Sequence, residues 1–383
     1  MLRFLTSGES HGPGLVTVVE GLPAGLEVSR RALAAELARR RIGHGRGRRM
    51  AIERDETEIL GGVRFGRTLG SPVAVIIRNT EWPNWQEDMS PDPGEADHRL
   101  TAPRPGHADL AGMLKYGTHD ARDVLERASA RETAARAVAG YLAASLLGTI
   151  GVESISHVTA IGAVAAPEGP VPQLSDRAEI EASPVRTLDG GVQAAMIDAI
   201  DAAEADRDTL GGVVEVVVHG LVPGLGSHVH WDRRIDTRLA GALMSIPAIK
   251  AVEIGDGVLG AGRRGSEAHD EIEWGEYGFE RPTNRSGGIE GGMTTGAPLR
   301  IRAHMKPLST LMRALGTVDV DTKAPEKAIR ERSDVCAVPA AAVIAEHMVQ
   351  FVVADEAMRK FGGDTVADFV AAADSYRQRI MGF

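Results

Sequence analysis

GLVTVVEGLPAGL (residues 14–26) and GVVEVVVHGLVPGLG (residues 212–226) decide the fold, because similar wording occurs in both halves of the chain. Each stretch is a run of β-branched residues that ends in a turn rich in glycine and proline, which is typical of a largely buried strand. A similar helical pattern follows each strand, LAAEL at 33–37 and LAGAL at 239–243. This order predicts a duplicated unit of strand and helix.

A second pair of similar stretches extends the duplication. The first half contains GGVRFGRTLGSPVAVIIRN (61–79), and the second half contains the similar stretch GGMTTGAPLRIRAHMK (291–306). Both stretches come after the first pair, so the order of the copies is kept. Short turn motifs of this kind can also recur by chance. A true duplication predicts two halves, roughly 14–79 and 212–306, that pack about a pseudo-twofold axis in a single domain, 1–383. The functional site is then expected where the halves meet.

Helical periodicity is clearest in RETAARAVAGYLAASLL (131–147), where apolar residues recur at helical spacing. Ser129 and Glu132 fit an S-x-x-E capping box at its start. Further helices are expected at 191–205, 338–360 and 364–380. Long polar stretches, which in compact domains are usually functional lids or mobile segments, occupy 80–103, 260–286 and 308–330.

Composition excludes several classes of protein. The chain has 383 residues, 43% hydrophobic and 25% charged, with a formal net charge of −10. The single cysteine, Cys336, rules out an internal disulfide framework. The sequence lacks an apolar run of about 18 residues, so we expect no membrane-spanning helix. Nucleic-acid-binding domains are usually basic, whereas this chain is acidic. A P-loop sequence, G-x-x-x-x-G-K-[ST], is absent, which argues against a P-loop kinase. We expect a cytoplasmic protein that binds neither membranes nor nucleic acid.

Against this acidic background, RRRIGHGRGRRM (39–50) concentrates positive charge. Ser29 can cap a helix over 30–41, and arginines on its last turn complement the helix dipole. After Gly43, glycines allow the backbone to bend while guanidinium groups grip phosphate bidentately. RNA-binding arginine–glycine tracts are longer, and the acids of MAIERDE (50–56) would repel a polyanion. The run therefore favours a small phosphorylated and carboxylated substrate.

Two histidines lie on glycine-rich turns. GESHG (8–12) matches the G-x-S-x-G nucleophile elbow of serine hydrolases, which needs a strand before it and a helix after it. Here only a few residues precede Ser10, and Pro13, Gly14 and an expected strand follow, so the elbow is disfavoured. A tight turn is one alternative, and a polar site residue at His11 is another. RPGHAD (104–109) places His107 after a second turn. Imidazole can donate to a phosphate or enolate near neutral pH, although either histidine could be structural.

Three further stretches carry groups that bind anions. ERASARET (126–133) places Arg127 and Ser129 at the beginning of a helix, where backbone N–H groups favour an anion. KPLST (306–310) and IRERSD (329–334) add lysine, arginine and hydroxyl groups. Ordinary capping and surface charge are the alternatives.

Taken together and in this order, GESHG, RRRIGHGRGRRM, RPGHAD, RASARET, GGIEGGMTTG and RSDVCAVPAAAVIAE resemble the chorismate synthase family, from residue 3 to about residue 360. The resemblance implies an α+β fold, a single-domain β-α-β sandwich with an internal pseudo-twofold duplication, assembled as a homotetramer. It implies a lyase of the shikimate pathway that converts 5-enolpyruvylshikimate 3-phosphate to chorismate by anti 1,4-elimination of phosphate and a proton. The family requires reduced FMN, for which NADPH is a candidate reductant.

The resemblance also implies the residues of the site. Contacts to the phosphate of substrate or NADP match Arg40, Arg46 and Arg49. The catalytic histidines, serines and carboxylate match His11, His107, Ser10, Ser129 and Asp355. The flavin contacts match Arg127, Ala128, Ser129, Pro247, Ala248, Gly291, Lys306, Pro307, Leu308, Ser309, Thr310 and Arg332. Pro247 departs from the family pattern, so its contact is expected through the backbone. We assign His11 to the departing phosphate and His107 to the flavin.

Overall fold

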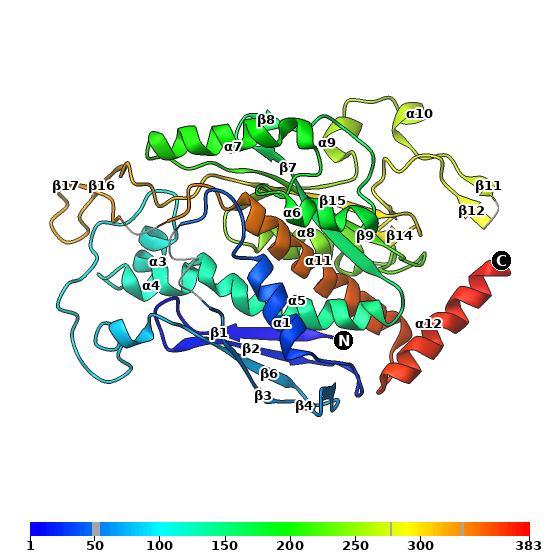
Figure 1. Cartoon of the computed structure of the whole chain (residues 1–383), viewed down its shortest axis with the longest axis horizontal. Helices are drawn as coiled ribbons and strands as arrows, with labels where there is room; N and C mark the ends of the chain where they lie inside the picture. Colours follow the sequence, from blue (N-terminus) through cyan, green and yellow to red (C-terminus); the bar gives the residue numbers. More distant parts are fainter. Residues whose placement is uncertain (48–53, 276–277, 331–332) are drawn as a thin grey trace.

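Two antiparallel sheets enclose a layer of helices in the computed structural model, which describes residues 1–47, 54–275, 278–330 and 333–383 (Figure 1). The first sheet has the strand order β1 (Arg3–Ser7), β2 (Gly14–Glu20), β6 (Val73–Arg78) and β3 (Thr57–Gly61). The second has the order β10 (Ile249–Ile254), β15 (Leu299–Met305), β9 (Gly212–His219), β7 (Glu153–Ile161) and β8 (Val164–Ala165).

The layer between the sheets contains α1 (Arg30–Arg39), α5 (Thr133–Gly148), α8 (Ile235–Met244) and α11 (Val338–Phe361). Helices α5 and α11 pack closely because Gly140 faces His347, and a Cβ at Gly140 would lie 2.2 Å from the Cβ of His347. Of the described helices, only α11 is long and apolar enough to cross a membrane, and that stretch is completely buried inside the fold.

The two sheets share one topology. The first unit runs β1, β2, α1, β3, β6, α5, and the second runs β7, β9, α8, β10, β15, α11, with the same strand order in each sheet. The predicted α+β sandwich with an internal duplication is therefore confirmed. Each unit also contains a strand before, and a helix after, the stretches 14–79 and 212–306 that carry the sequence similarity. The extent of the single domain, 1–383, stays a prediction.

The remaining helices surround this frame. The expected helices are present as α7 (Gly190–Ala205), α11 and α12 (Val366–Met381). Short helices and 3-10 turns are α3 (Asp109–Tyr116), α4 (Arg122–Ala128), α6 (Arg177–Ala182), α9 (Gly257–Gly260), α10 (Gly265–Ala268), η1 (Trp82–Asn84), η2 (Ala130–Glu132), η3 (Leu174–Asp176) and η4 (Trp231–Arg233).

Short strand pairs complete the description. They are β4 (Val63–Arg64) with β5 (Arg67–Thr68), β11 (Glu273–Gly275) with β12 (Gly278–Glu280), β13 (Ile289–Glu290) with β14 (Met293–Thr294), and β16 (Gly316–Val318) with β17 (Pro325–Lys327). Two of the pairs lie within the polar stretches 260–286 and 308–330, so these stretches contain regular structure that their composition did not indicate.

The capping box predicted before α5 is wrong. The Ser129 hydroxyl accepts from the backbone N–H of Arg131 at 3.3 Å, so it caps η2 and not α5 directly. The Glu132 carboxylate accepts from Nε of Arg136 at 2.9 and 3.0 Å. An ion pair one helical turn away has taken the place of the reciprocal capping contact.

Candidate functional site

The arginine run leads from the end of α1 into a buried charge cluster. Nη2 of Arg40 and Nε of Arg41 each lie 3.5 Å from Oδ2 of Asp55, and Nη1 of Arg131 contacts Oδ1. Asp55 is buried. Burial raises the pKa of Asp55, but Arg40, Arg131 and Arg41 lower that pKa more strongly, so the carboxylate stays ionised.

Arg46 extends the same cluster. Its Nη1 contacts the Asp334 carboxylate, which also accepts from the backbone N–H of Gly47 at 2.6 Å, and its Nη2 lies 3.5 Å from the carbonyl oxygen of Arg40. Burial lowers the pKa of Arg40 to about 10, against the attraction of Asp55. Nε of Arg40 and Nε of Arg46 are buried with no acceptor among the described residues.

Four guanidinium groups and two carboxylates meet in the described part of this cluster. Arg40, Arg41, Arg46 and Arg131 face the carboxylates Asp55 and Asp334. Guanidinium groups gathered in this way can bind a phosphate or a carboxylate through paired hydrogen bonds. Asp55, one of the acids of MAIERDE (50–56), turns its side chain into the cluster, where Arg40 and Arg131 offset its charge.

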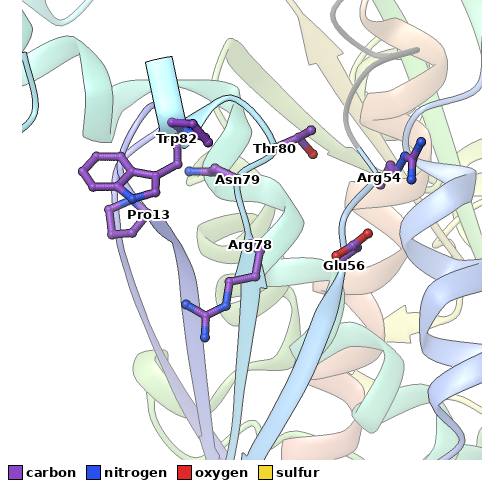
Figure 2. Close-up of a pocket in the computed structure, with 8 residues that line it drawn as sticks. Pro13, Arg54, Glu56, Arg78, Asn79, Thr80 and Trp82 are labelled. Carbon is purple, nitrogen blue, oxygen red and sulfur yellow. The ribbon is translucent and has the colours of Figure 1, made fainter. Parts of the chain in front are cut away.

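Asn79, immediately after β6, joins this cluster to the turn that carries His11. Its Oδ1 accepts from Nε of Arg131 at 3.1 Å, and its Nδ2 donates to the carbonyl oxygens of Glu9 and Gly12 at 3.0 and 2.8 Å. Figure 2 shows Asn79 among the residues of a surface groove of about 580 Å³, lined by Pro13, Arg54, Glu56, Arg78, Asn79, Thr80, Trp82 and Pro83. Hydrogen bonds through Asn79 thus join the arginine cluster to the His11 turn.

His11 is held by a buried carboxylate on α4. Its Nδ1 lies 2.9 and 3.0 Å from the two carboxylate oxygens of Glu126. The Ser10 hydroxyl donates to the same carboxylate at 2.5 Å, and Nη1 of Arg122 donates at 3.0 Å. The ring of Trp85 stacks on His11 with centroids 4.0 Å apart. Burial raises the pKa of Glu126, but hydrogen bonds from His11 and Ser10 lower that pKa more strongly.

His107 belongs to a second histidine–carboxylate cluster. Its Nδ1 contacts Oδ1 of Asp109, and Arg104 donates to the Asp109 carboxylate from Nε at 2.8 Å and from Nη2 at 3.1 Å. Nη1 of Arg104 donates to the hydroxyl of Thr310 at 2.9 Å. Burial raises the pKa of Asp109, but hydrogen bonds from His107 and Arg104 lower it more strongly. Asp109 is therefore the anionic partner of His107.

The stretch 306–310 packs against the His107 turn. Nζ of Lys306 donates to the carbonyl oxygen of Gly106 at 2.8 Å and to the hydroxyl of Ser309 at 2.7 Å. The backbone N–H of Lys306 donates to the carbonyl oxygen of Ala248 at 3.0 Å. Ala248 has a φ of +70°, in the left-handed region that disfavours a side chain. The structure thus brings His107, the stretch 306–310 and Ala248 together. Pro307 and Leu308 lie within that stretch, and Pro247 precedes Ala248 in the α8–β10 turn.

Other predicted residues have different surroundings. Nη1 and Nη2 of Arg127 donate to the carbonyl oxygens of Gly8 and Thr6, each at 3.0 Å, so Arg127 fixes the end of β1. Ala128 ends α4, and Gly291 lies in the β13–β14 turn with a φ of +58°. Arg49 and Arg332 lie outside the described residues.

Asp355 lies in a separate cluster in the protein interior. It is buried on α11 and accepts from the backbone N–H of Leu2 at 2.5 Å, from Nε of Arg359 at 2.9 Å, and from Arg238. These partners join the N-terminus to α8 and α11. The described residues do not connect Asp355 to either histidine cluster through a hydrogen bond.

Sequence reasoning missed the partners of the predicted residues. They are Asp55, Trp85, Arg104, Asp109, Arg122, Glu126, Arg131 and Asp334. Most lie within or beside the motifs that were singled out, so a search for charge-compensating residues next to each motif could have found them. Trp85 lies in a polar stretch and gave no such signal. Among the described residues, no group of three or more histidine, cysteine, aspartate or glutamate side chains is arranged to hold a metal ion.

Comparison with known proteins gives one family over almost the whole chain. The family model for chorismate synthase matches residues 2–358. The chorismate synthase of Acidothermus cellulolyticus is 61% identical over 377 residues, 96% of each chain, and that of Thermobifida fusca is 58% identical over 386 residues, 98% of each chain. A crystal structure of chorismate synthase superimposes with a TM-score of 0.81 at 38% identity, covering 100% of this chain and 99% of that chain. The chain therefore belongs to the chorismate synthase family and is an enzyme of its class, a lyase of the shikimate pathway.

Proposed function

We propose that the chain converts 5-enolpyruvylshikimate 3-phosphate to chorismate by anti 1,4-elimination of phosphate and a proton, and that it requires reduced FMN. The observation that carries this proposal is the buried arginine cluster, in which Nε of Arg40 and Nε of Arg46 have no acceptor among the described residues, joined through Asn79 to the turn of His11. The substrate carries a phosphate and two carboxylates, so its recognition needs several guanidinium groups. A proton donor beside the cluster suits phosphate as a leaving group.

The arginines have two tasks in this proposal. Arg40 and Arg46 bind the anionic groups of the substrate, because each has a buried Nε–H without an acceptor among the described residues. The same groups stabilise the charge that develops on the departing phosphate, and they act strongly because their Nε atoms are buried. Asp55 and Asp334 orient them before the substrate binds.

The histidines hold protons at opposite ends of the reaction. His11 passes a proton to the departing phosphate, which makes the C–O bond easier to break. His107, paired with Asp109 and close to the stretch 306–310, holds a positive charge beside the cofactor. The role of Asp355 in passing a proton stays a prediction. Its two carboxylate oxygens accept from Leu2, Arg238 and Arg359, so a proton-passing role requires that one of these bonds opens.

The residues present fit FMN by the chemistry of their donors. The ammonium of Lys306 and the hydroxyls of Ser309 and Thr310 face the His107 turn, and a Cβ at Gly291 would meet nothing within 4 Å. We propose that these residues, with the Ala248 backbone and the segment 127–129, hold the cofactor. When bound, reduced FMN supplies electron density to the allylic system of the substrate as the C–O bond breaks.

Anaerobic turnover tests the proposal. Purified protein should release phosphate from 5-enolpyruvylshikimate 3-phosphate with photoreduced FMN, and equal turnover without flavin would overturn the proposal. A second arm with NADPH and oxidised FMN asks whether the chain reduces its own flavin. We further propose that the enzyme is a cytoplasmic homotetramer, and sedimentation equilibrium measures the number of subunits.

A further inference from the structure

The carboxylate of Glu126 accepts hydrogen bonds from Ser10, His11 and Arg122. Oε1 lies 2.9 Å from Nδ1 of His11 and 3.0 Å from Nη1 of Arg122. Oε2 lies 2.5 Å from the Ser10 hydroxyl and 2.9 Å from the backbone N–H of His11. A carboxylate has about four acceptor sites, so these donors use its full capacity. Glu126 is 3% exposed, which leaves little access for water.

This arrangement determines which nitrogen of His11 carries a proton. An ionised carboxylate can only accept a hydrogen bond, so Nδ1 of His11 must be the donor. In the neutral ring, Nε2 then has the free lone pair, and in the charged ring Nε2 carries the transferable proton. Nε2 has no hydrogen-bond partner among the described residues, whereas Nδ1 is fully engaged.

The plane of the ring is fixed as well. Trp85 stacks on His11 with an interplanar angle of 26°, and the guanidinium of Arg122 lies 4.9 Å from the centre of the Trp85 ring. Arg122 in turn donates to Glu126, so the four side chains form a closed ring of contacts. Rotation of the imidazole would break the stack and the hydrogen bond at once.

We propose that Glu126 is the positioning residue of His11, which fixes the proton on Nδ1 and thereby makes Nε2 the nitrogen that exchanges a proton with the bound substrate. This inference rests on the proposed function for its kinetic consequence, but its structural content is a tautomer that exists without substrate. Ser10 supports Glu126 from the other side by donating its hydroxyl proton to the same carboxylate.

The test compares Glu126→Leu, which removes both acceptors, with Glu126→Asp, which keeps a shorter carboxylate. In full-length protein labelled with ¹⁵N-histidine, two-bond ¹H–¹⁵N correlation spectra at about pH 9 report the tautomer of each neutral ring. We expect the Nδ1–H form of His11 in the wild type and in Glu126→Asp, and the Nε2–H form in Glu126→Leu. If Glu126→Leu does not fold, Glu126→Gln takes its place with a mixture of both forms expected.

Kinetics then separate positioning from a structural role. In Glu126→Leu or Glu126→Gln, kcat should fall by at least about tenfold and by no more than the roughly 10²–10⁴-fold that a positioned proton donor typically supplies, while KM stays within about twofold. Glu126→Asp should restore part of kcat. The matched control is Asp232→Asn, because Asp232 binds Nδ1 of His230 at 2.7 Å in an exposed pair. That variant should leave kcat and the His11 spectrum unchanged.

Each outcome decides between the two proposals. A wild-type enzyme that releases no phosphate with reduced FMN refutes the proposed function, while the spectra still test the tautomer. An active wild type with the same His11 tautomer in Glu126→Leu, or with kcat unchanged in the variants that remove the carboxylate, overturns the role of Glu126 alone. Equal losses of kcat in Asp232→Asn and Glu126→Leu would also overturn it.

Discussion

Replacement of Asp55 by asparagine tests the electrostatic basis of the arginine cluster. The substitution keeps the size of the side chain but removes the negative charge that Arg40, Arg41 and Arg131 share. All three guanidiniums would then face one another across a neutral amide. We expect a large loss of stability that a dissolved anion can partly reverse, because an anion can enter where the carboxylate charge was.

The structure gives the size of the loss. A unit charge 3.5 Å from a guanidinium, the separation of Asp55 from Arg40 and from Arg41, interacts with about 5 kcal/mol at an effective dielectric constant of about 20. Part of this gain is offset by desolvation of the buried groups. Breaking a buried pair costs about 3–5 kcal/mol, and Asp55 is 3% exposed, so that range applies to the free energy of unfolding of Asp55→Asn.

Urea unfolding with and without inorganic phosphate is the assay. Phosphate at about 100 times its dissociation constant adds about 2.7 kcal/mol to a protein that binds it only when folded. The control is Asp256→Asn, since Asp256 binds Arg263 at 2.7 Å and Arg300 at 3.3 Å, away from the cluster. Phosphate should stabilise Asp55→Asn more than the wild type or Asp256→Asn. A loss below about 1 kcal/mol, or equal phosphate effects in all three proteins, would refute the reasoning.

Four further predictions address the rest of the site. Arg46→Lys should raise the KM for substrate at least about tenfold, because a point charge replaces a bidentate fork, and duplex DNA at physiological salt should not compete with substrate. His11→Ala should lower the single-turnover elimination rate and leave the affinity for reduced FMN nearly unchanged, whereas His107→Ala should change the pH titration of reduced FMN absorbance; the reverse pattern would exchange their roles. Hydrogen exchange in 80–103 should slow when FMN and substrate are added together, and unchanged exchange would argue against closure of that loop. Burial raises the pKa of Glu215, but its histidine and arginine partners lower it from 4.5 to about 2. The depressed pKa contributes roughly 3 kcal/mol of stability that is present above pH 4.5 and lost as the pH falls towards 2. Between pH 4.5 and 2, the free energy of unfolding should therefore fall less steeply in Glu215→Gln than in the wild type. An equal fall in both proteins would contradict the lowered pKa of Glu215.

Local patterns predicted the main strands and helices of this protein because the spacing of apolar residues indicates which face of a strand or helix is buried. The similar stretches 14–26 and 212–226 contain the equivalent strands β2 and β9. The pattern did not reveal that β1 and β7 belong to the same units. Strand β1 alternates exposed and half-buried residues, which is a weak local signal, and it pairs with β2 along its whole length.

The polar contacts of the site could not be predicted in the same way. His11 and Glu126 are 115 residues apart, and Arg46 and Asp334 are 288 apart. The first pair forms when the first unit folds, and the second forms only when the two units pack, so no local periodicity contains either pair. The sequence therefore indicated residue types that bind anions, and left open which carboxylate neutralises which cation.

The duplication nevertheless organises both histidine turns in one way. Strands β6 and β15 occupy equivalent places in the two sheets, and each is followed at once by a donor, Asn79 or Lys306. Asn79 donates to the carbonyl oxygens of Glu9 and Gly12 around His11, and Lys306 donates to the carbonyl oxygen of Gly106 before His107. A backbone carbonyl is a fixed acceptor, so a donor at a strand end positions a whole turn and not only one side chain. The two units thus hold two histidine turns in the same way, from the ends of the equivalent strands β6 and β15, although the chemical surroundings of the two turns differ. An amide beside the His11 turn links it to the arginine cluster, whereas an ammonium beside the His107 turn adds positive charge where the cofactor is proposed to bind.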